Sequence, residues 1–170
     1  MACDDPETQA LFANEGTLVP PMELGPADTL GFDVARSLTA EMGTLTLEFS
    51  TTCEGAVYLW ALLWDLTGGN DTQNADSLYY AVDGGEEQTW LYGCSTTEGT
   101  DMTWWWLPAE TWSMSGCDHQ ALELELPAGD HTIVIRNREP GAAVDVAAIA
   151  AVGVSHDPQV DPNTFVQLPE

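Results

Sequence analysis

The chain has 170 residues, 44% of them hydrophobic, and a formal net charge of −25 from 28 acidic residues against three arginines and no lysine. This length and composition suit one globular domain with a sizeable core, and no apolar run is long enough to span a bilayer. A surface this acidic repels phosphate backbones and anionic lipids. We therefore expect no nucleic-acid partner and no membrane insertion. The acidity is equally consistent with a role in solubility alone.

The first part of the chain consists of short apolar segments separated by turns. Residues 1–8 are polar and acidic, and we expect them to form a flexible leader. Residues 43–51 alternate apolar and polar positions, which predicts a strand with one face in a core. Residues 55–67 (GAVYLWALLWDLT) are almost entirely apolar, which predicts a central strand buried on both faces. Shorter strands or extended segments are expected at residues 9–16, 18–26 and 29–37.

The middle of the chain contains a hairpin signal and a tryptophan-rich segment. Residues 76–83 predict a strand that ends at a Gly-Gly turn, and residues 88–92 return as its partner. The run TWWW at residues 103–106 begins a further strand. Residues 112–120 are expected to form a loop.

Residues 120–152 carry the clearest strand pattern. Leucine and glutamate alternate at residues 122–126, a Pro-Ala-Gly-Asp turn follows, and residues 131–135 alternate again. A second turn precedes an apolar run at residues 144–154. This succession of three strands joined by two tight turns predicts three neighbours in one antiparallel sheet. We expect the rest of the domain to be organised around that sheet.

Many short strands at this spacing predict an all-β fold, a two-sheet antiparallel β-sandwich, over residues 9–155. Residues 156–170 contain three prolines and are expected to form a C-terminal tail.

The four cysteines form no CxxC or Cys/His zinc spacing, so a sulfur-bound metal is not expected. An even count in a loop-rich β protein favours two disulfides and an oxidising compartment. Of the three possible connectivities we favour Cys94–Cys117, which would brace the tryptophan-rich segment, and this leaves Cys3–Cys53. The alternative is that Cys3 is the lipidated first residue of a lipoprotein, which would leave Cys53 free.

Tryptophans are concentrated between positions 90 and 112, where five of the seven lie. Flat aromatic rings can stack on the C–H faces of pyranose sugars, with nearby polar groups for the hydroxyls. On a strand, Trp104 and Trp106 share one face and Trp105 takes the other, so one side can meet solvent. For each ring the alternative is packing in the core. The candidate ligand-binding residues are Trp104, Trp106, Trp112, Trp90 and Tyr79.

Two polar features add candidates. Residues 65–76 are rich in side-chain oxygens suited to a hard cation, and Asp71 and Asp76 are the metal-ligand candidates among them. The alternative is a solvated loop with Asx turns. Arg138 is the sixth candidate ligand-binding residue: it either holds a turn through an acidic partner or receives an anionic sugar such as a uronate.

Several short motifs follow one another in a recognisable order. An xWxLW-type strand precedes a polar loop, DSLYY at 76–80, VDGG at 82–85 and WWW at 104–106, and the chain closes with AGDHT, REPG and VD between residues 128 and 145. In this order they resemble bacterial carbohydrate-binding modules of the family 6 and family 35 type, from about residue 11 to 154. The resemblance implies a jelly-roll β-sandwich that binds sugars without cleaving them, with a structural calcium ion.

The resemblance also implies where that calcium ion would bind. The family's first strand commonly has two glutamates one residue apart as ligands, whereas this chain has Phe12-Ala13-Asn14-Glu15, in which one position is apolar and the other is an amide or shifted by one. Asp145 matches a late aspartate of the pattern. The implied metal candidates are therefore Glu15, Asn14 and Asp145.

Catalytic signatures are missing from the sequence. Among 28 acids no glycosidase pair can be identified, and no GxSxG elbow or phosphate-binding glycine loop is present. We therefore expect a secreted or cell-surface monomer that binds a poly- or oligosaccharide without catalysis. One alternative is a cell-surface or lipoprotein interaction domain that keeps the fold but binds no sugar. A calcium-dependent accessory of a hydrolase or lyase is another.

Overall fold

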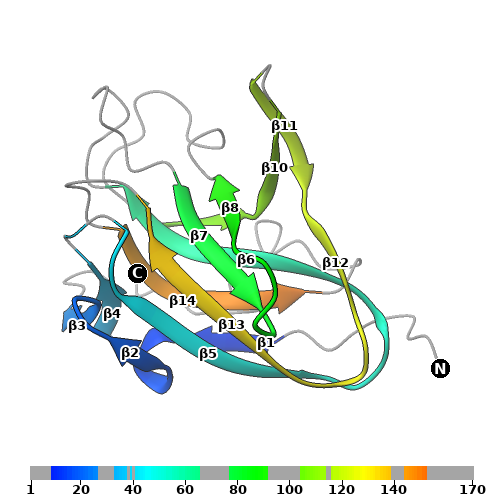
Figure 1. Cartoon of the computed structure of the whole chain (residues 1–170), viewed down its shortest axis with the longest axis horizontal. Helices are drawn as coiled ribbons and strands as arrows, with labels where there is room; N and C mark the ends of the chain where they lie inside the picture. The colour runs from blue at the N-terminus through cyan, green and yellow to red at the C-terminus, as the bar shows by residue number, and fades with distance from the viewer. Residues whose placement is uncertain are drawn as a thin grey trace.

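The computed structural model describes residues 9–26, 33–37, 39, 41–65, 77–91, 104–113, 116–138 and 144–152. In this part of the chain two antiparallel sheets pack face to face, which confirms the predicted all-β sandwich (Figure 1). The described strands run from Gln9 to Val152, and the expected leader and tail lie outside the described residues. No helix within these ranges is long and apolar enough to cross a membrane.

Sheet 1 is organised around strand β6, which pairs with β14 along one edge and with β12 and then β9 along the other. Beyond β14 lie β1 and β4, and β3 forms the outer edge. The strands of sheet 1 are β1 (Gln9–Phe12), β3 (Glu23–Pro26), β4 (Asp33–Arg36), β6 (Gly55–Asp65), β9 (Trp104–Pro108), β12 (Glu123–Leu126) and β14 (Val144–Val152).

Sheet 2 has the order β11-β10-β8-β7-β13-β5-β2, with β13 near its centre. Figure 1 shows β10 and β11 as a hairpin that projects from the body of the sandwich. The strands of sheet 2 are β2 (Thr17–Val19), β5 (Thr44–Thr51), β7 (Ser77–Val82), β8 (Gln88–Leu91), β10 (Glu110–Ser113), β11 (Gly116–Ala121) and β13 (Gly129–Asn137).

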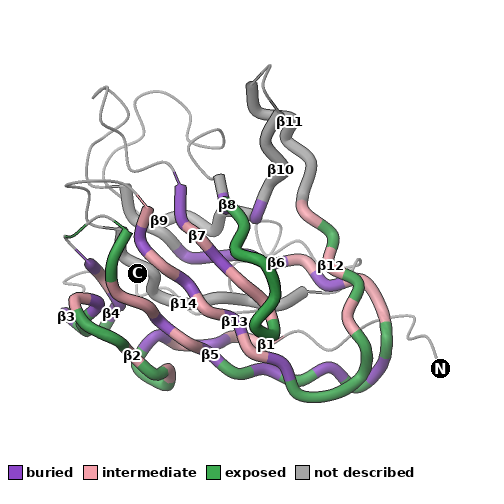
Figure 2. The backbone as a smooth tube through the Cα atoms, viewed as in Figure 1, coloured by how far each residue is buried: buried purple, intermediate pink, exposed green. Residues whose placement is uncertain are grey.

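The core lies between the sheets and follows the period-two pattern of the sequence. In β5 and β13 alternate residues are buried and the residues between them are half-buried or exposed (Figure 2). Strand β6 differs, because Trp60, Ala61 and Leu62 are buried in succession. This confirms its prediction as a central strand buried on both faces. Buried members of the core include Leu45, Leu47, Phe49, Leu59, Leu78, Ile133 and Ile135.

Two local predictions are wrong. The first strand ends at Phe12, and the rest of residues 9–16 begins with the 3₁₀ helix η1 (Ala13–Glu15). Residues 112–120 are not a loop, because most of them belong to the hairpin of β10 and β11, in which Trp112 pairs with Cys117. Strand β11 forms the edge of sheet 2, where backbone pairing does not require the apolar alternation used for the prediction.

The three C-terminal strands do not form one antiparallel sheet. Strand β12 pairs with β6 in sheet 1, β13 lies between β7 and β5 in sheet 2, and β14 returns to sheet 1. The turns between them therefore cross the sandwich. Alternation indicates which face of a strand is buried, but it does not indicate which sheet supplies the neighbour, so the sequence pattern gave the strands and missed their pairing.

Candidate functional site

Trp90 is a core residue. It is 0% exposed, pairs with Leu78 across β7 and β8, and its ring makes an edge contact with Tyr80 at 5.8 Å between centroids. Burial of the Tyr80 hydroxyl in this part of the core raises its pKa to about 12. A fully buried indole cannot stack on a sugar, so the prediction of Trp90 as a ligand-binding residue is wrong.

The backbone register places Trp104 and Trp106 on the outer face of sheet 1. They pair with Trp64 and Leu62 of β6, whereas Trp105 pairs with Leu63. Directly paired residues occupy the same face of a sheet, and the even-numbered positions of β6 face away from the core that holds Leu59 and Ala61. This is the division of faces expected from the sequence.

Part of this outer face is covered. Trp60 is 8% exposed and Leu62 is 0% exposed, although neither belongs to the cluster between the sheets. A second layer of atoms must therefore pack on β6 from outside. The indole Nε1 of Trp60 is buried and has no hydrogen-bond partner within the described structure.

Tyr79 lies on the opposite exterior, on the outer face of sheet 2, together with two of the three arginines. The Arg136 guanidinium lies 4.3 Å from the centre of the Tyr79 ring, and that of Arg138 lies 5.8 Å from it. Both distances fall within the range of cation–π attraction. Arg138 also donates a hydrogen bond to the buried Ser77 hydroxyl. Tyr79 and Arg138 therefore belong together, on the far side of the sandwich from Trp104 and Trp106.

Arg136 holds neighbouring segments in place. Its Nε donates to a carboxylate oxygen of Glu87 at 2.9 Å, its Nη2 binds the other oxygen, and its Nη1 donates to the Glu41 carbonyl at 2.8 Å. The hydrogen bonds from Arg136 lower the pKa of Glu87 despite the opposing effect of partial burial.

The calcium candidates are only partly assembled by the described residues. Strand β1 pairs with β14 up to Phe12 and Ala148, so η1 with Asn14 and Glu15 continues toward the end of β14 that carries Asp145. Asn14 and Glu15 are exposed, and no group of three acidic, histidine or cysteine side chains suited to a metal occurs among the residues described. The side chain of Asp145 lies outside the described residues. Asp71 and Asp76 lie outside the described part of the chain.

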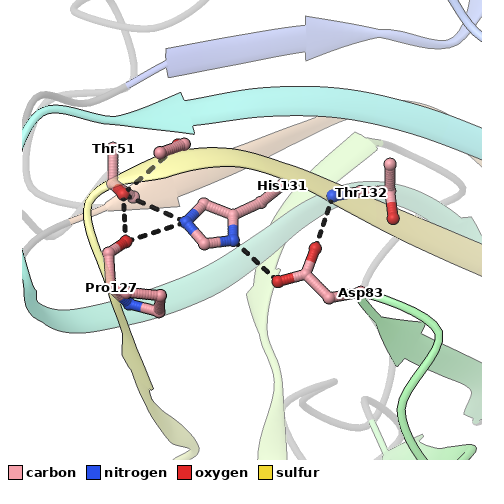
Figure 3. A network of polar contacts seen from close by, with 6 residues as sticks. Thr51, Asp83, Pro127, His131 and Thr132 are labelled. Atoms are coloured by element: carbon pink, nitrogen blue, oxygen red, sulfur yellow. Dashed lines mark hydrogen bonds and ion pairs between the residues drawn. The ribbon is translucent and has the colours of Figure 1, made fainter.

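The sequence analysis missed a buried polar network around His131. Its imidazole contacts the carboxylate of Asp83, the carbonyl of Pro127 and the hydroxyl of Thr51 (Figure 3). Two weak signals were present: Asp83 precedes the Gly-Gly turn, and His131 occupies an inward position of an alternating strand. Their proximity depends on the register of β7 with β13, which is a non-local property.

Comparisons with known proteins define the class of the fold. No protein-family model matches the chain, and no curated protein matches it in sequence. Solved structures do: the sandwich has the fold of carbohydrate-binding modules of families 35 and 6, over most of its length.

Three structures illustrate the likeness. A family 35 module from Clostridium thermocellum matches with a TM-score of 0.60 and 15% identity over 85% of this chain and 98% of the module. The C-terminal family 6 module of a marine laminarinase from Zobellia galactanivorans matches with a TM-score of 0.58 and 9% identity, over 86% and 99%. An exo-β-1,3-galactanase from Phanerochaete chrysosporium, solved with β-1,3-galactotriose, matches with a TM-score of 0.58 and 15% identity over 85% of this chain. The match spans only 29% of the galactanase.

Proposed function

We propose that this domain binds a poly- or oligosaccharide without cleaving it, and that it acts outside the cytoplasm, secreted or at the cell surface. The observation that carries the proposal is the likeness to isolated carbohydrate-binding modules, which this chain covers almost completely. The same chain covers only 29% of the galactanase. Because one fold can serve several functions, the proposal also needs a site.

The proposed platform lies along β9 at the end of β6. Trp104 pairs with Trp64, the residue before the last of β6, so the aromatic positions adjoin the start of the oxygen-rich segment 65–76. Aromatic rings beside amide and carboxylate groups are the combination that sugar recognition requires. Trp106 extends the platform along the strand, and Trp112 on the projecting β10–β11 hairpin is a further candidate.

A second candidate surface is the outer face of sheet 2 around Tyr79 and Arg138. A guanidinium within reach of an aromatic ring would suit an anionic sugar such as a uronate. Arginine is scarce in this chain, and two of its three arginines flank this one tyrosine, which favours this face over a neutral surface.

Two further expectations accompany the proposal. Two disulfides would fit an extracytoplasmic protein, and within the described ranges no cysteine is free. A structural calcium ion would require ligands beyond the described residues in addition to Glu15, Asn14 and Asp145, and its contribution would be to hold the entry to β2 against β14. The chain is expected to act as a monomer.

The experiment is affinity electrophoresis of the folded protein in gels that contain different soluble polysaccharides, with calcium and with a chelator. Retardation by one glycan class supports the proposal, and sensitivity to the chelator assigns a role to calcium. Normal migration in every gel would contradict sugar binding and favour the alternative of a cell-surface interaction domain with the same fold.

A further inference from the structure

His131 is buried at one end of the sandwich, with 3% of its side chain exposed. Its ring packs against Phe49 at 5.2 Å between centroids, and both ring nitrogens have close polar neighbours. Nδ1 lies 2.7 Å from a carboxylate oxygen of Asp83, and Nε2 lies 2.9 Å from the Pro127 carbonyl oxygen and 3.1 Å from the Thr51 hydroxyl (Figure 3).

The chemistry of these neighbours determines where the protons are. A carbonyl oxygen only accepts, so Nε2 must donate to Pro127. Burial alone would raise the pKa of Asp83, but hydrogen bonds from His131 and from the Thr132 amide lower it overall, so this carboxylate also accepts. Each ring nitrogen of His131 therefore faces an oxygen that can accept a hydrogen bond from it.

A neutral ring would fit this arrangement poorly. With a proton on Nδ1 alone, the lone pair on Nε2 would face the Pro127 oxygen at 2.9 Å. The Thr51 hydroxyl could supply a proton to Nε2 only by giving up its 2.6 Å bond to the same carbonyl. Loss of one proton from His131 thus replaces an attraction with a repulsion or costs a second hydrogen bond.

The ring joins three segments that are distant in sequence. Asp83 lies in the turn between β7 and β8, where it has a positive φ of 52°, and its other carboxylate oxygen accepts from the Thr132 amide at 2.8 Å. Pro127 lies in the crossing from β12 to β13, and Thr51 ends β5. One imidazole ring therefore contacts a hairpin turn, a sheet crossing and a strand end together.

Among the described residues, the other titratable side chains that line the depression at the ring are acidic. Glu48 on β5 and Asp130 on β13 line the same surface depression as His131, with Gln9 and Ser50 beside them. Arg136 faces away, on the outer side of β13.

We propose that His131 is a proton-dependent lock, closed while the imidazole holds two protons and opened by the loss of one. Opening would loosen the turn of Asp83 and the crossing at Pro127 as the pH rises. The effect would extend to the outer face of sheet 2, because the same turn leads to Glu87, which holds Arg136 over Tyr79.

Nitrogen-15 NMR of the folded protein between pH 5 and 9 tests the lock. We expect two ring N–H protons on His131 at low pH. When one is lost, the protection factor of the Thr132 amide should fall about tenfold, the scale of a hydrogen bond to a charged group. The Leu122 amide, which donates to Ala109 elsewhere in the molecule, is the internal reference and should not change in step.

Two variants sharpen the test. Asp83→Asn keeps an oxygen acceptor but removes the charge, so the lock should open at a lower pH. Asp130→Asn removes a charge from the same depression but leaves the hydrogen bonds of the ring with Asp83, Pro127 and Thr51 in place, and should shift the opening less. If Asp83→Asn does not fold, the wild-type titration decides. A single ring N–H across the whole pH range, or Thr132 protection that is unaffected by the ring's titration, would overturn the proposal.

Discussion

The two exteriors of the sandwich are built differently. On sheet 1, Trp60 and Leu62 point away from the core and are nevertheless buried. On sheet 2, Val134 and Arg136 of β13 occupy the equivalent outward positions and are half-exposed. On the first exterior the middle of β6 is apolar and covered at Trp60 and Leu62. The second exterior carries two of the chain's three arginines around Tyr79.

This difference is encoded in the two strand sequences. Strand β6 is apolar at successive positions, which a strand can tolerate only if both of its faces are removed from water. Strand β13 alternates, and therefore has one face for the core and one for solvent or a ligand. The comparison separates the two candidate sugar surfaces: an aromatic one beside β6, and a charged one on β7 and β13.

The largest expected effect on stability comes from a substitution in the core and not on either exterior. Trp90→Ala should lower the free energy of unfolding by about 3–5 kcal/mol, because it leaves a cavity the size of an indole in the core. Urea denaturation measures this loss, and Trp90→Phe should recover part of it. If the alanine variant is as stable as the wild type, Trp90 is not the core residue described.

On the outer face of sheet 1, we expect a substitution at a covered position to lower the free energy of unfolding as much as a substitution in the core. Leu62→Ala should destabilise the protein by about 2–5 kcal/mol, whereas Val134→Ala on the other exterior should cost less than about 1 kcal/mol. Urea denaturation of the two variants compares the faces directly. Equal, small losses would mean that nothing packs on the outside of sheet 1.

The smallest effect concerns the charged exterior and depends on pH. Because Arg136 lowers the pKa of Glu87 in the folded state, this pair stabilises the protein above the unfolded glutamate pKa of about 4.3, and the contribution disappears as the pH falls through the lower folded value. Glu87→Gln should therefore cost less than about 1 kcal/mol at pH 7, since both side chains are partly exposed.

At pH 3 the difference between Glu87→Gln and the wild type should be smaller than at pH 7. Urea denaturation at both values measures it. A difference that does not change with pH would mean that the ion pair does not contribute as described.

Local patterns in the sequence predicted most strands and the faces they bury. The alternation of residues 43–51 and the apolar run of β6 were sufficient, because burial of one face or of two is written in consecutive residues. The features that the sequence analysis missed depend on pairing between residues far apart in the chain. The sheet to which β12 belongs, the burial of Trp90 against Leu78, and the contact between Asp83 and His131 are all fixed by pairing between segments far apart in the chain.

The central claim is that this sandwich binds a sugar through the aromatic residues of β9. The most direct measurement is isothermal titration of the glycan that gives the strongest retardation, with the wild type and with two matched variants, Trp106→Ala and Tyr79→Ala. We expect Trp106→Ala to weaken binding roughly thirtyfold, the scale of an aromatic hot spot of about 2 kcal/mol, and Tyr79→Ala to leave it nearly unchanged. Loss of binding in Tyr79→Ala with full binding in Trp106→Ala would contradict the claim and move the site to the charged exterior.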